Sequence, residues 1–253
     1  MVGAVPLSRL AEQLTLGDHE HVAIVGGGGK TTVMHALGDQ LDGRIVLTCT
    51  TKMGHDQHRG RELLLSPSDH DVMAATEAGV PVIAWQRVDG AKAVGVEPTD
   101  CDRWFGLVDH VVIEADGSRR RPFKAPAPYE PVVPASVTTL VSVIGADALG
   151  RVIADQCHRP LRVAALAECT PYERLSPAHA ATVLLHERGA RKELRGGRLA
   201  VVVTKVDDAS APFVAELVDE IAQRDPEVPV VAVAFEPMRP SLRSGGAQGE
   251  PGP

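Results

Sequence analysis

Short apolar runs recur along the chain and alternate with segments in which apolar and polar residues are mixed at helical spacing. A short apolar run bounded by glycine or proline is typical of a strand buried on both faces. This pattern predicts strands at His21–Val25, Arg44–Thr48, Val80–Trp85, His110–Ala115, Thr139–Gly145, Arg198–Thr204 and Val228–Phe235. The mixed segments predict helices at Pro6–Leu16, Thr31–Leu41, Ser68–Ala78, Pro98–Leu107, Pro160–Glu168, Pro177–His186 and Ala211–Arg224.

Alternation of apolar strands with helices predicts an α/β fold. We expect a mainly parallel sheet with helices on both faces, in the three-layer arrangement of P-loop NTPases. Residues 1–235 are predicted to form a single domain, and residues 236–253, rich in glycine, proline and serine, a disordered tail. Residues 87–96 suggest a hairpin that turns at Asp89-Gly90, and residues 51–60 are predicted to form a polar loop.

Composition narrows the function classes. The net charge of −7 argues against general nucleic-acid binding, which needs a basic face. No apolar run approaches the roughly 20 residues of a membrane-spanning helix, and the first residues lack a signal-peptide pattern. The four cysteines form no C-x-x-C pair, so we expect reduced thiols and a cytoplasmic protein.

The segment VGGGGKTT, residues 25–32, carries the first candidate chemistry. A strand, a glycine-rich loop and Lys-Thr at the start of a helix are the parts of a phosphate-binding loop. Backbone N–H groups at a helix start lack internal partners, and the helix dipole favours an anion there. We therefore predict that nucleotide phosphates bind Gly26, Gly27, Gly28, Gly29, Lys30, Thr31 and Thr32, with Lys30 on the β- and γ-phosphates and Thr31 on Mg²⁺.

This loop departs from the pattern G-x-x-x-x-G-K-[ST]. That pattern needs glycine at position 24, where the chain has Ile24, so the glycine loop is shorter by two residues. The alternative interpretation is a tight strand–helix turn with an incidental lysine. The flanking strand and helix, together with the KTT sequence, favour phosphate binding.

Acidic residues follow the apolar run at 110–115. Glu114 and Gly117 fit an E-x-x-G pattern in which the carboxylate holds Mg²⁺ and the glycine N–H senses the γ-phosphate; Asp116 is the alternative ligand. By itself, Asp116-Gly117 would be a common turn. Next to the glycine loop, we treat Glu114 and Asp116 as metal and catalytic candidates, together with Lys30.

The segment Thr204-Lys205-Val206-Asp207 resembles the [NT]-K-x-D motif of GTPases, in which the aspartate reads guanine. A polar loop after a strand is the alternative, so ATP and GTP both remain open. Two polar clusters, TCTTK at 48–52 and SRRRPFK at 118–124, are candidates for binding phosphate or for closing over it. His55 and His58 are too few for a metal site and fit a solvated loop, and Cys157-His158 is at most a contact to substrate or partner.

These motifs, in this order, resemble the selenium-dependent hydroxylase accessory protein family (YqeC-type) over about residues 21–235. The most specific part is residues 114–134, with EADGS and YEPVVP. The resemblance implies a nucleotide-binding accessory role in maturation of molybdenum hydroxylases, with the client enzyme or its cofactor-assembly proteins as partners. We add Thr50, Lys52, Arg119, Lys124 and Glu130 as candidate contacts to substrate or phosphate. The E-x-x-G feature is also similar to metallochaperone GTPases, at the level of fold.

Three hypotheses follow for function. The main one is a Mg²⁺-dependent NTPase that helps to insert or modify a molybdenum cofactor. Hydrolysis of ATP or GTP would release a closed loop, the one formed by residues 119–124. The second is a phosphoryl- or nucleotidyltransferase acting on a small anionic or pterin-type acceptor. The third is a non-catalytic binding module gated by nucleotide. The sequence leaves the client, the involvement of selenium and the oligomeric state open.

Overall fold

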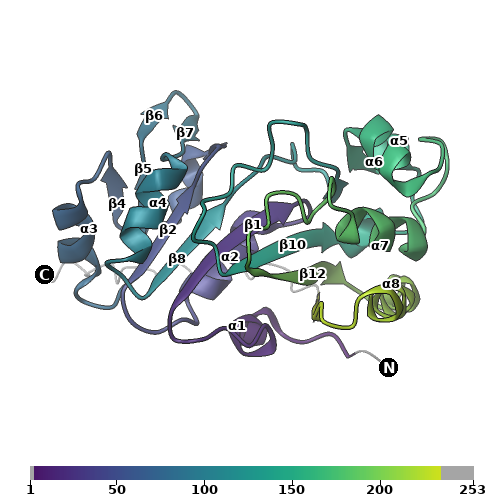
Figure 1. Ribbon diagram of the computed structural model, residues 1–253, viewed down its shortest axis with the longest axis horizontal. Helices are drawn as coiled ribbons and strands as arrows, with labels where there is room; N and C mark the ends of the chain where they lie inside the picture. The colour runs from purple at the N-terminus through teal and green to yellow at the C-terminus, as the bar shows by residue number, and fades with distance from the viewer. Residues whose placement is uncertain (1–2, 235–253) are drawn as a thin grey trace, which may run out of the picture.

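A computed structural model of the chain describes residues 3–234 and is built around one eight-stranded sheet (Figure 1). The strand order is β13-β12-β10-β1-β8-β2-β5-β4, and every neighbouring pair is parallel. The strands are β1 (Glu20–Gly26), β2 (Ile45–Cys49), β4 (Leu63–Leu65), β5 (Val82–Trp85), β8 (His110–Glu114), β10 (Thr139–Gly145), β12 (Arg198–Val206) and β13 (Val230–Ala234). The predicted parallel α/β sheet is confirmed.

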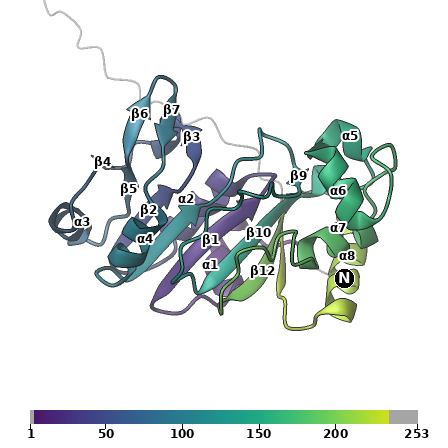
Figure 2. The ribbon, with the colours of Figure 1, turned by 45° about the horizontal axis from the view of Figure 1, so that its top comes forward.

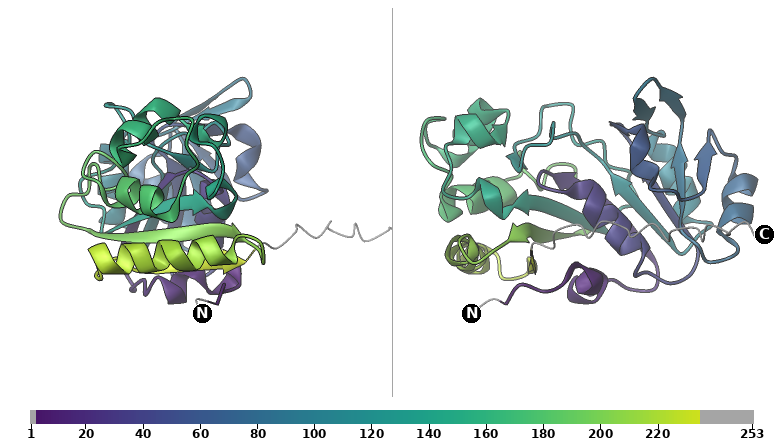
Figure 3. Two further views of the ribbon diagram at one scale, coloured as in Figure 1. Left: turned by 90° about the vertical axis from the view of Figure 1, so that its right-hand side faces the viewer. Right: turned by 180° about the vertical axis from the view of Figure 1, so that it is seen from behind.

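Helices cover both faces of this sheet, as a three-layer fold requires. One face is covered by α1 (Leu10–Gln13) and α2 (Lys30–Gly38). The other is covered by α3 (Asp69–Thr76), α4 (Pro98–Phe105), α6 (Pro160–Ala167), α7 (Pro177–Leu185) and α8 (Ala211–Arg224). Figure 1 shows α4 and α7 in front of the sheet, and the reverse view in Figure 3 shows α2 in front of it.

Two apolar cores explain why the strands are mainly apolar. Along β1, Val22 and Ile24 pack into the core beneath α1 and α2, whereas Ala23 and Val25 pack into the opposite core. A strand with a core on each face is expected to be mainly apolar, and the sequence displays this pattern with a few buried polar residues such as Thr48 and Ser142.

The chain reverses its direction of travel across the sheet at β1. Strands β8 and β2 lie on one side of β1, and β10, β12 and β13 on the other. Loops that follow strands on the two sides of such a point diverge and leave a crevice at the carboxyl ends of the strands. The glycine loop, the acids after β8 and the segment after β12 all lie at this edge.

Two smaller sheets lie outside the main one. Strands β3 (Lys52–Gly54), β7 (Lys92–Val94) and β6 (Arg87–Asp89) form an antiparallel sheet that contains the predicted hairpin. In Figure 2 it stands at the opposite end of the molecule from α5 (Ile153–Gln156) and α6. Strands β9 (Phe123–Lys124) and β11 (Cys157–His158) pair in parallel above the crevice.

The structure corrects the prediction of a polar loop at 51–60. Lys52–Gly54 is a strand and His55–His58 is the 3-10 helix η2, because Met53 is buried next to Ala93 of β7. The strand β4 and the pair β9–β11 were also missed.

Two predicted helices are shorter than expected. The first consists of the 3-10 helix η1 (Leu7–Arg9) followed by α1. Helix α2 ends at Gly38, because the Gln40 backbone N–H bonds to Leu37 O and its side-chain amide bonds to Ala36 O.

Two further predictions concern the C-terminal tail and the absence of a membrane-spanning helix. The predicted tail at 236–253 lies outside the described residues. Within residues 3–234, no helix combines the length and the apolar character needed to cross a membrane.

Candidate functional site

The glycine loop joins β1 directly to α2 at the centre of the sheet. Gly26, Gly28 and Gly29 have φ angles of +94°, +85° and +127°, which side chains other than glycine rarely adopt. Helix α2 begins at Lys30, so the N–H groups of its first turn lack helical partners and point out of the loop. Their dipole favours an anion at this position.

Packing accounts for part of the glycine run. The N–H groups of Gly27 and Gly28 already donate to Val143 O (2.8 Å) and Arg121 O (3.1 Å). A Cβ on Gly27 would lie 2.4 Å from Arg121 O, and one on Gly28 would lie 2.2 Å from the backbone nitrogen of Gly145. These two glycines are therefore needed for contact with neighbouring backbone, and the N–H groups that remain for a ligand belong to the start of α2.

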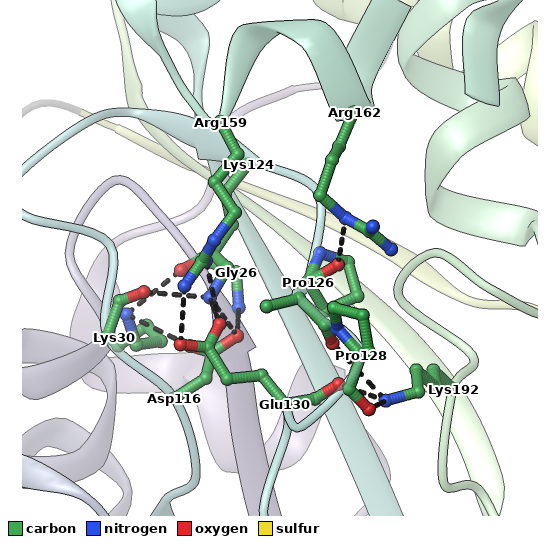
Figure 4. A network of polar contacts seen from close by, with 12 residues as sticks. Gly26, Lys30, Asp116, Lys124, Pro126, Pro128, Glu130, Arg159, Arg162 and Lys192 are labelled. Carbon is green, nitrogen blue, oxygen red and sulfur yellow. Dashed lines mark hydrogen bonds and ion pairs between the residues drawn. The ribbon is translucent and has the colours of Figure 1, made fainter. Parts of the chain in front are cut away.

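Lys30 is buried at the base of the crevice (Figure 4). Its Nζ donates to Gly26 O at 2.9 Å and lies 3.3 Å from Asp116 Oδ1 and 3.7 Å from Glu114 Oε1. Burial opposes the charge on Lys30, but the two carboxylates outweigh burial and raise its pKa. The lysine is therefore charged, and the carboxylates of Asp116 and Glu114 hold it at the loop.

Asp116 ties together three parts of the site. Its carboxylate accepts from the Gly26 N–H at 3.1 Å and contacts Lys124 Nζ at 3.0 Å as well as Lys30. Only 2% of this side chain is exposed, and the two lysines beside it are equally buried. An acid surrounded in this way positions Lys30 and the loop and has little room for a metal ion.

Glu114 has different surroundings, although it is only two residues away. Its Oε2 accepts from Thr31 Oγ1 at 2.7 Å, and the side chain lines the crevice. A hydroxyl and a carboxylate side by side fit Mg²⁺, which takes oxygen ligands and keeps several from water and phosphate. Residues 3–234 contain no group of three or more His, Cys, Asp or Glu side chains able to hold a metal, so these further ligands would be needed.

The buried ion network continues away from the loop. Lys124 Nζ contacts Glu130 at 2.6 Å, and Glu130 accepts two hydrogen bonds of 2.8 Å from Arg159, which precedes α6 (Figure 4). Burial alone would raise the pKa of Glu130, but Arg159 and Lys124 lower it to about 2. The network links the glycine loop to the segment of residues 124–130 and to α6.

A cavity of about 370 Å³ opens in front of α2 and is lined by Gly28, Gly29, Lys30 and Thr31 of the loop and by the predicted contacts Lys52 and Arg119. Lysines and arginines outnumber acids among its charged residues. These residues are Lys30, Lys52, Lys92, Arg119, Arg120, Lys205, Asp56 and Glu114. On a chain with a net charge of −7, such a local excess of positive charge fits an anionic ligand.

The residues of the T-K-x-D segment have different partners in the structure. Thr204 Oγ1 donates to Gly28 O, and Lys205 lines the cavity while pairing with Asp147 at 2.8 Å. Asp207 instead accepts from Ser210 N at 2.8 Å and Ser210 Oγ at 2.6 Å at the start of α8, and it does not line the 370 Å³ cavity. Thr204 and Lys205 thus contact the loop or its cavity, whereas Asp207 bonds to Ser210 and lines, with Lys205, a separate cavity of about 280 Å³.

The remaining predicted contacts are spread more widely. Thr50 donates to Val132 O at 2.6 Å and supports the loop after β9, whereas Thr32 is exposed and accepts from Arg59 at 3.3 Å. Lys124 and Glu130 belong to the buried network and do not line the cavity.

Sequence reasoning missed several residues of the site. Lys92 and Asp147 carry no motif, and only the hairpin that holds Lys92 gave any signal; Arg120 was not named, although it lies within the basic run SRRRPFK that was singled out. Arg159 stands beside the Cys157-His158 pair that was noted as a possible contact.

Comparison with known proteins identifies the family of the chain. A sequence profile described as "YqeC protein" matches residues 22–161, which include the loop, Glu114, Asp116 and Lys124. The chain belongs to the YqeC family. It is 28% identical over 218 residues to YqeC of Escherichia coli K12, named an uncharacterized protein, covering 81% of this chain and 84% of that protein. No solved structure matches this YqeC family member.

Proposed function

We propose that this YqeC family member binds a Mg²⁺–nucleoside triphosphate at the start of α2. The observation that carries the proposal is Lys30, a buried lysine that is held by Asp116 and Glu114 and lines a cationic cavity. A charged lysine next to free helix N–H groups is an arrangement suited to bind phosphate.

Each residue has a distinct task in this proposal. The N–H groups of the first turn of α2 would bind phosphate oxygens, and Lys30 would turn from Gly26 O toward them. Thr31 and Glu114 would hold Mg²⁺, which neutralises phosphate charge when bound. Asp116 would keep Lys30 charged and aligned.

The base has a candidate position beside the loop. A second cavity of about 210 Å³ is lined by Gly29, Thr32 and Lys205 together with apolar side chains, among them Leu7 and Val33. A partly apolar lining suits packing of a purine, and the aliphatic stem of Lys205 would cover one side. Because Asp207 is engaged by Ser210, the choice between ATP and GTP stays open in this proposal.

The cellular role rests on the family resemblance. We propose that nucleotide binding or hydrolysis assists maturation or cofactor insertion of a molybdenum hydroxylase in the cytoplasm, with the hydroxylase or its assembly proteins as partners. The segment of residues 118–124 contacts the glycine loop through Arg121 O, so it is the part best placed to respond to nucleotide.

Calorimetric titration with non-hydrolysable ATP and GTP analogues, with and without Mg²⁺, tests the proposal. We expect Mg²⁺-dependent binding of at least one analogue. The Asp207→Ala variant decides the base: loss of a GTP preference would establish guanine reading, and an unchanged profile would reduce Asp207 to a turn residue. Failure of both analogues to bind the wild-type protein would refute nucleotide binding.

A group-transfer reaction is the second candidate function. The observation that favours it is the number of cations in the cavity, which exceeds what one nucleotide bound with Mg²⁺ needs. Release of phosphate from the nucleotide in water alone would support the NTPase; turnover only with an acceptor would support the transferase. Binding without turnover under either condition would support the nucleotide-gated module.

A further inference from the structure

Two walls of the 370 Å³ cavity carry cations that the nucleotide loop does not explain. One wall is the small sheet, which contributes Lys52 and Lys92; the other is the turn after β8, which contributes Arg119 and Arg120. We call these four residues the cation rim. They come from segments far apart in the sequence, so the fold brings their charges together.

The register of the small sheet places its two lysines together. Lys52 of β3 pairs with Val94, and Gly54 pairs with Lys92 of β7. Lys52 and Lys92 are therefore diagonal neighbours on one face, while Met53 and Ala93 are buried on the other. Like charges at this spacing repel, so the arrangement favours an anion between them.

The rim is not neutralised by neighbouring acids. Within residues 3–234 none of its four members makes an ion pair. Asp89 lies opposite Lys92 in the register and Asp56 lines the cavity, yet neither reaches ion-pair distance of a rim cation. The rim therefore keeps its charge for a ligand.

The second wall is held in a costly backbone conformation. Arg119 and Arg120 have φ angles of +51° and +62°, in the left-handed region that residues with side chains seldom adopt. Strain of this kind persists where the surrounding structure enforces it and is concentrated at binding sites. Here the bonds Gly28 N–H to Arg121 O and Gly145 N–H to Pro122 O fix the segment that follows.

We propose that the cation rim binds the phosphate group of a second small molecule, next to the terminal phosphate of the nucleotide. This inference rests on the proposed function, because Lys30 and the start of α2 are assigned to the nucleotide. Guanidinium and ammonium groups from two segments that line one cavity suit a phosphate monoester, which presents oxygens in several directions. The chain would then bring two phosphate-bearing ligands together in one cavity.

Inorganic phosphate serves as the probe for this second site. The wild-type protein, saturated with a Mg²⁺-bound non-hydrolysable nucleotide, is titrated with phosphate by calorimetry. We expect one further phosphate to bind, and the double variant Lys52→Ala/Lys92→Ala to weaken it by about tenfold or more while nucleotide affinity changes by less than about threefold. The control is Arg87→Ala, on the same face of the small sheet but outside the cavity, which should leave phosphate binding unchanged.

The outcomes separate this inference from the proposed function. Absence of phosphate binding to the nucleotide complex, or equal binding to the double variant, would overturn the second site and leave nucleotide binding intact. If the wild-type protein bound no nucleotide but phosphate binding still depended on Lys52 and Lys92, the proposed function would fail and the rim would stand as an anion site. Circular dichroism of the double variant confirms that the small sheet remains folded.

Discussion

Glu114 ends β8 and Asp116 lies two residues beyond it, and their surroundings give them separate tasks. Asp116 is enclosed by Lys30, Lys124 and the Gly26 N–H, whereas Glu114 faces the cavity and accepts from Thr31. The sequence offered both as Mg²⁺ ligands. Only the folded chain shows which side of Lys30 each carboxylate occupies.

Exchanging each acid for its amide tests this division. Asp116→Asn leaves two buried lysines short of a counter-charge, so we expect the free energy of unfolding to fall by about 3 kcal/mol. Glu114→Gln keeps an acceptor for Thr31, so stability should change by less than about 1 kcal/mol. Urea unfolding measures both changes.

Nucleotide titration provides the second readout for the same pair. Glu114→Gln should lose most of the Mg²⁺ dependence of nucleotide affinity, by about tenfold or more. The opposite pattern, with Asp116→Asn stable but insensitive to Mg²⁺, would exchange the two assignments.

The ion pairs of Glu130 predict that the free energy of unfolding falls at acid pH. Its pKa is about 2, below the ordinary value of 4.5, so its pairing with Lys124 and Arg159 stabilises the fold fully above pH 4.5. That contribution is lost as the pH falls from 4.5 toward 2. Glu130→Gln should therefore be less stable than the wild type near pH 6, with a difference that shrinks below pH 4.5.

Urea unfolding at several pH values measures the Glu130 effect. The matched control is Glu62→Gln, since Glu62 is exposed and makes no ion pair in the part of the chain described. A constant difference between Glu130→Gln and wild type across pH 2 to 6 would contradict the prediction.

At the scale of elements, the glycine loop is inseparable from the segment of residues 121–123. The Gly28 N–H donates to Arg121 O, and a side chain at Gly27 would collide with the backbone of that segment. The loop is thus held between β10 and the segment of residues 121–123, which we call the strap and which directly follows Arg119 and Arg120 of the cation rim. A nucleotide bound at α2, as proposed, would therefore be coupled to the strap by direct contact.

Gly27→Ala tests this contact. Its Cβ would lie 2.4 Å from Arg121 O, and because backbone cannot yield as a flexible side chain does, we expect a loss of about 1–3 kcal/mol in the free energy of unfolding. The matched control is Gly117→Ala, also close to the site, where a Cβ would meet no atom within 4 Å. Equal stability of the two variants would show that the strap moves away freely.

The elements differ in how well the sequence predicted them. Strands such as β1 and β10 are buried on both faces, and their unbroken apolar runs identified them. The small sheet was partly missed, because β3 has a single buried side chain, Met53, among polar neighbours. Periodicity cannot reveal a three-residue strand whose partner lies about forty residues away. Because this pairing was not predicted, the position of Lys92 on the partner strand β7 was missed as well.

On the scale of the whole molecule, one parallel sheet brings the separate motifs to a common edge. The sequence allowed this to be predicted, since carboxyl ends of parallel strands share an edge and ligands bind where the strand order reverses. It could not predict the charge pairing between distant segments, such as Asp116 with Lys124 or Lys205 with Asp147. Those pairs depend on loop paths that apolar patterning does not specify.

The most direct test of nucleotide binding is the affinity of Lys30→Ala for the Mg²⁺-bound analogue that the wild-type protein prefers. We predict that calorimetric binding falls by about a hundredfold or more, because Lys30 supplies the buried positive charge at the loop. Lys192→Ala is the control, since Lys192 also donates to backbone carbonyls, at Pro128 and Glu130, but lies outside the cavity. Unchanged nucleotide affinity in a folded Lys30→Ala protein would contradict the account.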